Sequence, residues 1–393
     1  MSAVDIQINK GDPVALTQAL TRIDSRNPTL ASGSPGEASI AAALASLLES
    51  WGFDVSRVET APRRPNIIAR IGPPTGRALM FAGHLDTVGV EGMLHPPFDA
   101  KIDGDRLYGR GSADMKSGIA AMCCAALAAA EECGAKASRQ IIIAAVTDEE
   151  FESIGMRSLL EGGVTAECAI VTEPTRLAIC PAHRGFVWME IEFTGRAAHG
   201  SRYDIGVDAI RHAGLVLAEL DELDAGQLRS NTHALLGRGS LHASTISGGV
   251  GMSTYPDRCV LSVERRTIPG ETPDDAMREV RDACDRVRAR RPELTVTVRL
   301  ITAQSPSDVG RHAPVVGMLE RALGRAKMPA PIEGLSAWTD AALLNEAGIA
   351  AICFGPGDIA LAHAAEEYVP VSEIIRATEV LSNVAREWMM ETD

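Results

Sequence analysis

Short apolar runs of strand length alternate with segments of helical periodicity along most of the chain. Four such runs, each followed by a turn with acidic, histidine or glycine residues, cover residues 78–82, 140–146, 168–171 and 349–354. A long segment at 116–134 is almost continuous Ala, Met, Leu and Cys. Because strands that alternate with helices are typical of α/β proteins, we predict an α/β core with the 116–134 helix buried against its sheet.

Further elements are predicted at both ends of the chain. Apolar positions at helical spacing predict helices at 12–24, 36–51, 312–326, 339–347 and 371–390. Two strand-like segments lie at 53–58 and 66–71, and a turn is expected around 333–337. We expect the last helix to pack on the core.

The pattern changes after Pro181. Residues 186–193 alternate apolar and polar positions, as a strand with one solvated face does. The segments that follow predict a helix at 207–223, strands at 240–247 and 258–267, a helix at 273–290 and a strand at 294–300. This β-α-β-β-α-β order is typical of a small α+β sandwich. We therefore predict an inserted domain at 183–302 between two parts of a first domain, 1–182 and 303–393, with His183-Arg184-Gly185 at the hinge.

Histidine and acidic residues follow the four apolar runs. His84 and Asp86 follow the first run, and Glu149 with Glu150 follows the second. Glu173 and His363 follow the other two, and Asp114 lies on a turn. A lone His-x-Asp is often a simple hydrogen-bonded pair, but sites in open α/β sheets form at the carboxyl ends of strands. The recurrence therefore predicts a metal site, in which Asp86 lies behind His84 and holds its ring.

Seven segments, in register, resemble the M20 metallopeptidases, the group of acetylornithine deacetylase, succinyl-diaminopimelate desuccinylase, aminoacylase-1 and glutamate carboxypeptidase. They are GHLDT (83–87), GRGSADMKSG (109–118), TDEEFESIG (147–155), TEPT (172–175), AAHGSRYDIGVDAI (197–210), TDAALL (339–344) and FGPGDIALAHAAEEYVP (354–370). The resemblance implies a zinc-peptidase-like catalytic domain, with a mixed sheet flanked by helices. It also implies that the inserted α+β sandwich is a lid and dimerisation domain.

The resemblance also implies a ligand set for two divalent ions per subunit. His84 and Glu173 would hold one ion, Glu150 and His363 the other, and Asp114 would bridge them. Some relatives carry aspartate at the position of Glu173. Nitrogen and oxygen ligands favour zinc, although cobalt or manganese could replace it.

Other residues receive catalytic or substrate-binding roles. Glu149, adjacent to a ligand, is the candidate base that takes a proton from the attacking water, and the alternative is a solvated acidic pair before a helix. The AAHGS match implies that His199 reaches the partner subunit's site and stabilises the oxyanion, although a structural histidine is the default.

Relatives carry an arginine that grips the substrate carboxylate where this chain has Arg266, and Arg265 is the alternative. Gly355 and Gly357 are expected to offer backbone amides to substrate, or to form a plain turn. The resemblance also implies a cis peptide between Asp114 and Met115.

Composition and charge limit the kinds of partner and location that we expect. The net charge of −14 opposes attraction to nucleic acid, and basic stripes with interleaved aromatic residues are lacking. We do not expect a transmembrane segment, because the apolar runs fall short of the roughly 20 residues that cross a membrane. The N-terminus lacks the basic start and apolar core of a signal sequence, so we expect a cytoplasmic protein. The eight cysteines form no CxxC pair and are expected to be reduced core thiols.

The expected activity is hydrolysis of the amide bond of an N-acyl amino acid, on a small substrate bound by a homodimer. A metallo-carboxypeptidase or dipeptidase with the same ions is the first alternative. A non-catalytic binding paralogue is a remote one. The sequence leaves open the acyl group, the side chain accepted, the native metal and the resting state of the lid.

Overall fold

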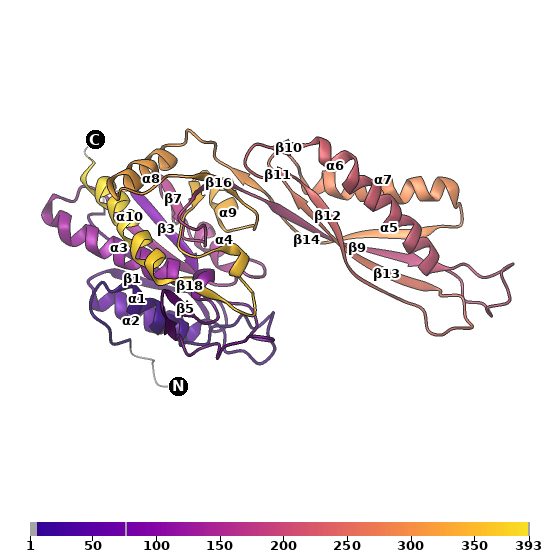
Figure 1. Ribbon diagram of the computed structural model, residues 1–393, viewed down its shortest axis with the longest axis horizontal. Coiled ribbons are helices and arrows are strands. Elements are labelled where there is room, and N and C mark those ends of the chain that lie inside the picture. The colour runs from indigo at the N-terminus through magenta and orange to yellow at the C-terminus, as the bar shows by residue number, and fades with distance from the viewer. Residues whose placement is uncertain (1–5, 75–76, 392–393) are drawn as a thin grey trace. The chain divides into compact units, whose positions relative to one another are not determined.

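The chain folds into two units in the computed structural model, which describes residues 6–74 and 77–391 (Figure 1). Unit 1 comprises Met1–Pro181, Val309–Glu333 and Thr339–Asp393, and unit 2 comprises Ala182–Asp308 and Gly334–Trp338. The boundary predicted at 302/303 falls inside strand β14 (Thr295–Gln304). Unit 2 continues past this strand to Asp308. The turn expected around 333–337 in the first domain begins within β16 (Ile332–Leu335), and Gly334–Trp338 belongs to unit 2.

A mixed sheet forms the centre of unit 1. Its strands, in spatial order, are β1 (Asp54–Ala61), β2 (Arg64–Ile71), β6 (Gln140–Val146), β3 (Ala78–His84), β7 (Cys168–Val171), β17 (Ala350–Cys353) and β8 (Ile179–His183). The four strands β6, β3, β7 and β17 run parallel to one another. On either side of them, β2 pairs antiparallel with β6 and with β1, and β8 pairs antiparallel with β17. The predicted mixed α/β sheet is confirmed.

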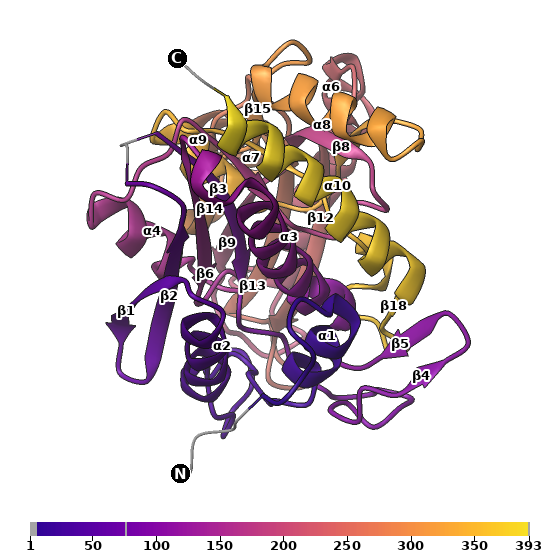
Figure 2. The same ribbon diagram turned by 90° about the vertical axis from the view of Figure 1, so that its left-hand side faces the viewer.

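Helices pack on both sides of this sheet. Alternate residues of the strands, such as Leu79 and Phe81 of β3, share one apolar core with helices on one face. These helices are α1 (Pro13–Thr21), α2 (Ala38–Ser50), α3 (Ser117–Cys133), α8 (Pro314–Arg325) and α10 (Val371–Met390). Figure 2 shows α3 and α10 side by side over the strands, while α4 (Ile154–Glu161) and α9 (Ala341–Glu346) lie on the other side in Figure 1.

Helix α3 is the apolar core helix that its composition predicted. The segment Ser112–Lys136 is long and apolar enough to cross a membrane by length and composition, contrary to our expectation that apolar runs of that length are lacking. Most of it is buried inside unit 1, and nearly every residue of α3 from Ser117 to Ala129 is inaccessible. Burial on several sides accounts for the composition of this helix.

Short elements complete unit 1. A small sheet joins β4 (Ile102–Asp103), β5 (Arg106–Tyr108) and β18 (Tyr368–Pro370), and the one-turn helices are η1 (Ser112–Lys116), η2 (Gly134–Lys136) and η3 (Ile359–Leu361). This small sheet was not predicted, because strands of two or three residues carry no measurable periodicity.

Unit 2 is the α+β sandwich that the pattern predicted. Its sheet has the order β12 (Ser240–Gly248), β13 (Arg258–Thr267), β9 (Gly185–Thr194) and β14, covered by α5 (Ala209–Ala225) and α7 (Pro273–Arg290). The apolar positions of β9 face a core of its own with these two helices. Its minor elements are α6 (Gln227–Ser230), β10 (Thr232–His233), β11 (Gly237–Arg238) and β15 (Ser307–Asp308).

All eight cysteines are free and buried, as expected.

The first turn of α3 packs directly on the strand end that carries Glu173. A Cβ on Gly118 would lie 2.0 Å from the carbonyl oxygen of Thr172, so only glycine fits there. We expect Gly118→Ala to lower the free energy of unfolding by about 1–3 kcal/mol through overpacking. Gly324→Ala in α8, where a Cβ meets no atom within 4 Å, is the matched control and should be neutral or stabilising. Denaturant unfolding of both variants tests this, and equal stability would contradict the proposed contact.

Candidate metal centre

The ends of the four parallel strands bring the predicted ligands together. His84 is the last residue of β3, Glu149 and Glu150 follow β6, and Glu173 follows β7. His363 follows β17 after the short helix η3. Since neighbouring parallel strands end at the same edge of a sheet, four separate stretches of sequence meet at one place.

Asp114 lies between the two histidines. Its Oδ1 is 3.0 Å from Nε2 of His84, and its Oδ2 is 3.4 Å from Nε2 of His363. The same His363 nitrogen is 2.9 Å from Oε2 of Glu150. Ligand atoms of His84, Asp114 and Glu150 all lie within 4.8 Å of one another. A carboxylate with one oxygen toward each histidine has the arrangement of a ligand that bridges two ions.

Two buried oxygens at this centre have no hydrogen-bond partner among the described residues. They are Oε1 of Glu150 and Oε1 of Glu173. An unpaired buried carboxylate oxygen is costly unless a cation or a donor occupies the space before it. The residues therefore fit divalent cations, and the mixed nitrogen and oxygen donors suit zinc, manganese or cobalt.

The pKa values of the acidic and histidine side chains at this centre also indicate that positive charge is lacking there. Burial, reinforced by the negative charge of neighbouring carboxylates, raises the pKa of Glu149 and Glu173 well above the ordinary value and also raises that of Glu150. Burial also lowers the pKa of His363, but its hydrogen bonds to Asp114 and Glu150 outweigh that effect and raise it to about 10. For Asp114 the hydrogen bonds from both histidines outweigh burial and lower the pKa. Protons thus take the place that cations would fill.

Asp86 supports this centre, but not in the way that we expected. The ring nitrogen Nδ1 of His84 lies 2.9 Å from the backbone oxygen of Asp86 and 3.6 Å from its carboxylate, so the carbonyl is the hydrogen-bond acceptor. This bond places the proton on Nδ1 and leaves Nε2 to bind a cation. The carboxylate of Asp86 instead accepts the backbone amides of Glu149 at 3.2 Å and Glu150 at 3.3 Å.

The turn of Asp114 depends on a residue that sequence reasoning missed. Asp114 is buried in η1 rather than on an open turn, and the Asp114–Met115 peptide is cis, as the resemblance implied. The carboxylate of Glu367 accepts the backbone amides of Ala113 and Asp114 and pairs with Arg110 at 2.6 Å. Glu367 is 253 residues from Asp114 in sequence, so no local pattern indicates this support.

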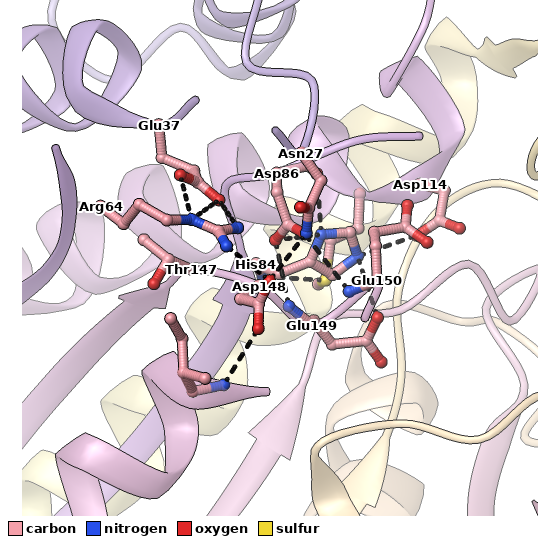
Figure 3. A network of polar contacts seen from close by, with 12 residues as sticks. Asn27, Glu37, Arg64, His84, Asp86, Asp114, Thr147, Asp148, Glu149 and Glu150 are labelled. Carbon is pink, nitrogen blue, oxygen red and sulfur yellow. Dashed lines mark hydrogen bonds and ion pairs between the residues drawn. The ribbon is translucent and has the colours of Figure 1, made fainter. Parts of the chain in front are cut away.

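Glu149 is the one acidic side chain of its turn that points at a histidine without being a predicted ligand. Its Oε2 lies 4.0 Å from Nε2 of His84, and its side chain is 11% exposed. In Figure 3 Glu149 extends from the turn after β6, beside Glu150 and below His84. This position, next to the metal ligands but outside the predicted ligand set, suits a proton-transfer group.

The amides of the Gly355–Gly357 loop are already used by the protein. The amide of Gly355 donates to Oγ1 of Thr175 at 3.1 Å, and that of Gly357 donates to Glu373 at 2.8 Å. A Cβ on Gly355 would meet the carbonyl oxygen of Glu173 at 2.6 Å. The expected donation of these two amides to substrate is therefore not supported, and the loop is a tight turn that glycine allows to pack against the ligand strand.

His199 and Arg266 belong to unit 2, so their predicted roles stay predictions. His199 is exposed, with its Nδ1 2.8 Å from Oγ of Ser201. Arg266 is partly exposed, pairs with Glu264 and lies over the ring of Phe186. Arg265, the alternative, is fully buried and pairs with Glu271 and Glu279, so its guanidinium is not open to a substrate.

Comparisons with known proteins found relatives over most of the chain. The chain is 32% identical over 348 residues to an acetylornithine deacetylase from Myxococcus xanthus, covering 85% of this chain and 88% of that relative. It is 30% identical over 380 residues to a putative succinyl-diaminopimelate desuccinylase from Mycobacterium tuberculosis, covering 95% and 97%.

Solved structures share the fold at low sequence identity. A tripeptidase from Staphylococcus aureus superposes with a TM-score of 0.79 at 19% identity, covering 98% of this chain and 100% of that one. A dinuclear metal-binding M20 peptidase from Bacillus subtilis gives 0.71 at 14% identity, covering 96% of this chain and 97% of that one. The model of peptidase family M20/M25/M40 matches residues 80–387, and the chain belongs to this family.

Proposed function

We propose that this protein hydrolyses the amide bond of N-acyl amino acids at a centre that holds two divalent metal ions. The observation that carries the proposal is the Asp114 carboxylate, which faces His84 with one oxygen and His363 with the other. The two relatives at 30–32% identity are named for acetylornithine and succinyl-diaminopimelate, both N-acyl amino acids. Similarity over most of the chain supports the same reaction class here.

Each ion would have ligands from this chain. His84 and Glu173 would hold one ion, Glu150 and His363 the other, and Asp114 would bind both. Zinc is the proposed native metal, because borderline nitrogen and oxygen donors favour it. When bound, the ions would polarise the scissile carbonyl and lower the pKa of the attacking water.

Proton transfer falls to Glu149. Its carboxylate would take a proton from the attacking water and give it to the nitrogen of the leaving amine, so that each product leaves with the correct number of protons. Burial raises the pKa of Glu149 in the metal-free protein, and bound cations would lower it and keep the carboxylate ionised for the first step. Arg266 would bind the substrate carboxylate, for which its planar guanidinium offers two parallel donors.

A homodimer is proposed from the surface of unit 2. Strand β12 lies at the edge of its sheet and is exposed over most of its length. Exposed apolar side chains lie on β12, on α5 and in the loop after β12, and they are Ile246, Ile210, Leu217, Val250 and Met252. An open edge with apolar neighbours is a ready surface for a second copy of the chain. In such a dimer His199 would stabilise the oxyanion in the partner's site.

The reaction is tested with zinc-loaded protein and a panel of N-acetyl amino acids, N-succinyl amino acids and dipeptides. We expect turnover of one acyl class, and we expect Glu149→Gln to lower kcat by about 100-fold or more while both ions stay bound. Dominant dipeptide cleavage would favour the peptidase alternative. An unchanged kcat in the variant would overturn the role of Glu149.

Metal loading should depend on pH in a defined direction. His363, with its pKa raised to about 10, carries a proton in the metal-free protein at neutral pH and must release it to bind a cation. Apparent zinc affinity should therefore rise with pH between 6 and 8 and fall on acidification. Calorimetry in buffers of different ionisation enthalpy would detect the released protons, and a pH-independent affinity would refute the expectation.

Removal of the metal should also lower stability. An ion present at 100 times its Kd adds about 2.7 kcal/mol to the free energy of unfolding, so chelation should lower the Tm. Glu150→Gln should lose most of this zinc-dependent gain. Glu131→Gln, at an exposed glutamate that pairs with Lys10, should keep it.

The shared site can be tested by mixing variants. In a heterodimer of His199→Ala and Glu149→Gln subunits, one of the two sites has both residues intact. By symmetry such a heterodimer should regain about half of the wild-type activity, although each parent is nearly inactive. Isolated heterodimers without any gain would exclude a contribution from the partner.

A further inference from the structure

A chain of buried polar groups runs behind the metal centre. We call it the Asn27 network, and its members are Glu37, Arg64, Asp148, Asn27 and Asp86 (Figure 3). Arg64 pairs with Glu37 and, through Nη1, with Oδ1 of Asp148 at 2.7 Å. The side-chain amide of Asn27 donates to Oδ1 of Asp148 and to Oδ2 of Asp86, both at 2.9 Å.

The orientation of Asn27 is fixed by its other bonds. Its side-chain oxygen accepts the amide of Thr29 at 3.0 Å, so the nitrogen must face the two carboxylates. Its own backbone amide donates to the carbonyl of Thr87 at 2.8 Å, close to Asp86. Both hydrogens of one uncharged NH₂ group are thus used to hold two carboxylates.

Asp148 and Asp86 are the two carboxylates that hold the turn of Glu149 and Glu150 through hydrogen bonds. Asp148 has φ +67°, an unusual backbone conformation for a residue with a side chain. Its Oδ2 accepts the amides of Glu152 at 3.2 Å and Ile154 at 3.4 Å, which bends the chain after Glu150. Because Asp86 accepts the amides of Glu149 and Glu150, the pair holds both ends of the segment.

Burial makes these contacts mandatory. Asn27, Glu37 and Asp86 are 0% exposed, Asp148 is 1% exposed and Arg64 is 7% exposed. The Arg64 guanidinium pairs with Glu37 and Asp148. The carboxylate of Asp86 accepts its hydrogen bonds from neutral donors, the side-chain amide of Asn27 and the backbone amides of Glu149 and Glu150. Without the Asn27 amide, Asp86 and Asp148 would be two buried acids without a shared donor, and the turn would lose the contact that joins its two anchors.

We propose that Asn27 is a positioning residue for catalysis: by joining Asp86 to Asp148 it fixes the directions of Glu149 and Glu150 at the metal centre. It acts through these carboxylates, which are the two side chains that its amide group bonds. The proposal rests on the hydrolytic function proposed above, and it adds a residue from the N-terminal segment to the machinery of the strand ends.

The test compares Asn27→Leu, which keeps the approximate size and removes the amide, with Asn345→Leu. Asn345 is a suitable control because its side-chain amide also makes two hydrogen bonds within unit 1. It donates to the backbone oxygen of Ala351 at 2.9 Å and accepts the backbone amide of Ala351 at 2.7 Å. Loss of a group that orients metal ligands through hydrogen bonds typically costs about 10–100-fold, so we expect that drop in kcat and in zinc affinity for Asn27→Leu, with KM little changed. The control should keep both, even at an equal loss of Tm.

Hydrogen exchange provides a measurement that needs no substrate. The backbone amides of residues 149–154 should exchange faster in Asn27→Leu than in the wild type. Their exchange rates in Asn345→Leu should equal those of the wild type. If Asn27→Leu does not fold, Asn27→Ser keeps one donor in a smaller side chain and should show the same effects at reduced size. Wild-type exchange and kcat in either folded Asn27 variant would overturn the proposal.

The two proposals fail in different ways. A wild-type protein that turns over no N-acyl amino acid would refute the function, yet the exchange of 149–154 and the zinc affinity would still decide the role of Asn27.

Discussion

Mutual repulsion among buried carboxylates is the constraint that governs this structure. Four acidic side chains converge at the strand ends, and they are Asp114, Glu149, Glu150 and Glu173. Among the described residues their histidine partners are His84 and His363, and burial keeps the carboxylates out of contact with water. A fold can tolerate such a group of acids only if cations or protons neutralise it. The packing around the centre then has a second task, which is to keep the acids from turning away from each other when the cations are absent.

The parallel strands perform the first part of that task, and polar contacts from distant segments perform the second. β6, β3, β7 and β17 end at one edge, which places the ligands within reach. Glu367 holds the turn of Asp114, and Asp86 with Asp148 holds the turn of Glu149. Each support is itself a buried polar side chain, so the centre is surrounded by a further layer of hydrogen-bonded groups.

Local pattern was sufficient for the elements and for the residues at their ends. The apolar runs at 78–82 and 140–146 predicted β3 and β6, and the polar residues after them predicted the centre, because strand direction and strand end are local properties. The supports could not be predicted in this way. The contact between Asn27 and Asp148 spans 121 residues and has no period or spacing in the sequence. The glycine loop at 355–357 shows the reverse case, since its sequence suits amide donation and only its surroundings reveal that Thr175 and Glu373 have taken those amides.

The buried thiols have a practical consequence. Burial raises the pKa of Cys123, Cys124, Cys168 and Cys353, so these sulfurs stay protonated and poorly nucleophilic at neutral pH. With all eight cysteines enclosed, the native surface offers maleimide dyes little to react with. A single cysteine introduced on each unit could therefore carry a fluorophore pair without prior removal of the native ones. The protein is thus suited to a spectroscopic test of whether its two units move during turnover.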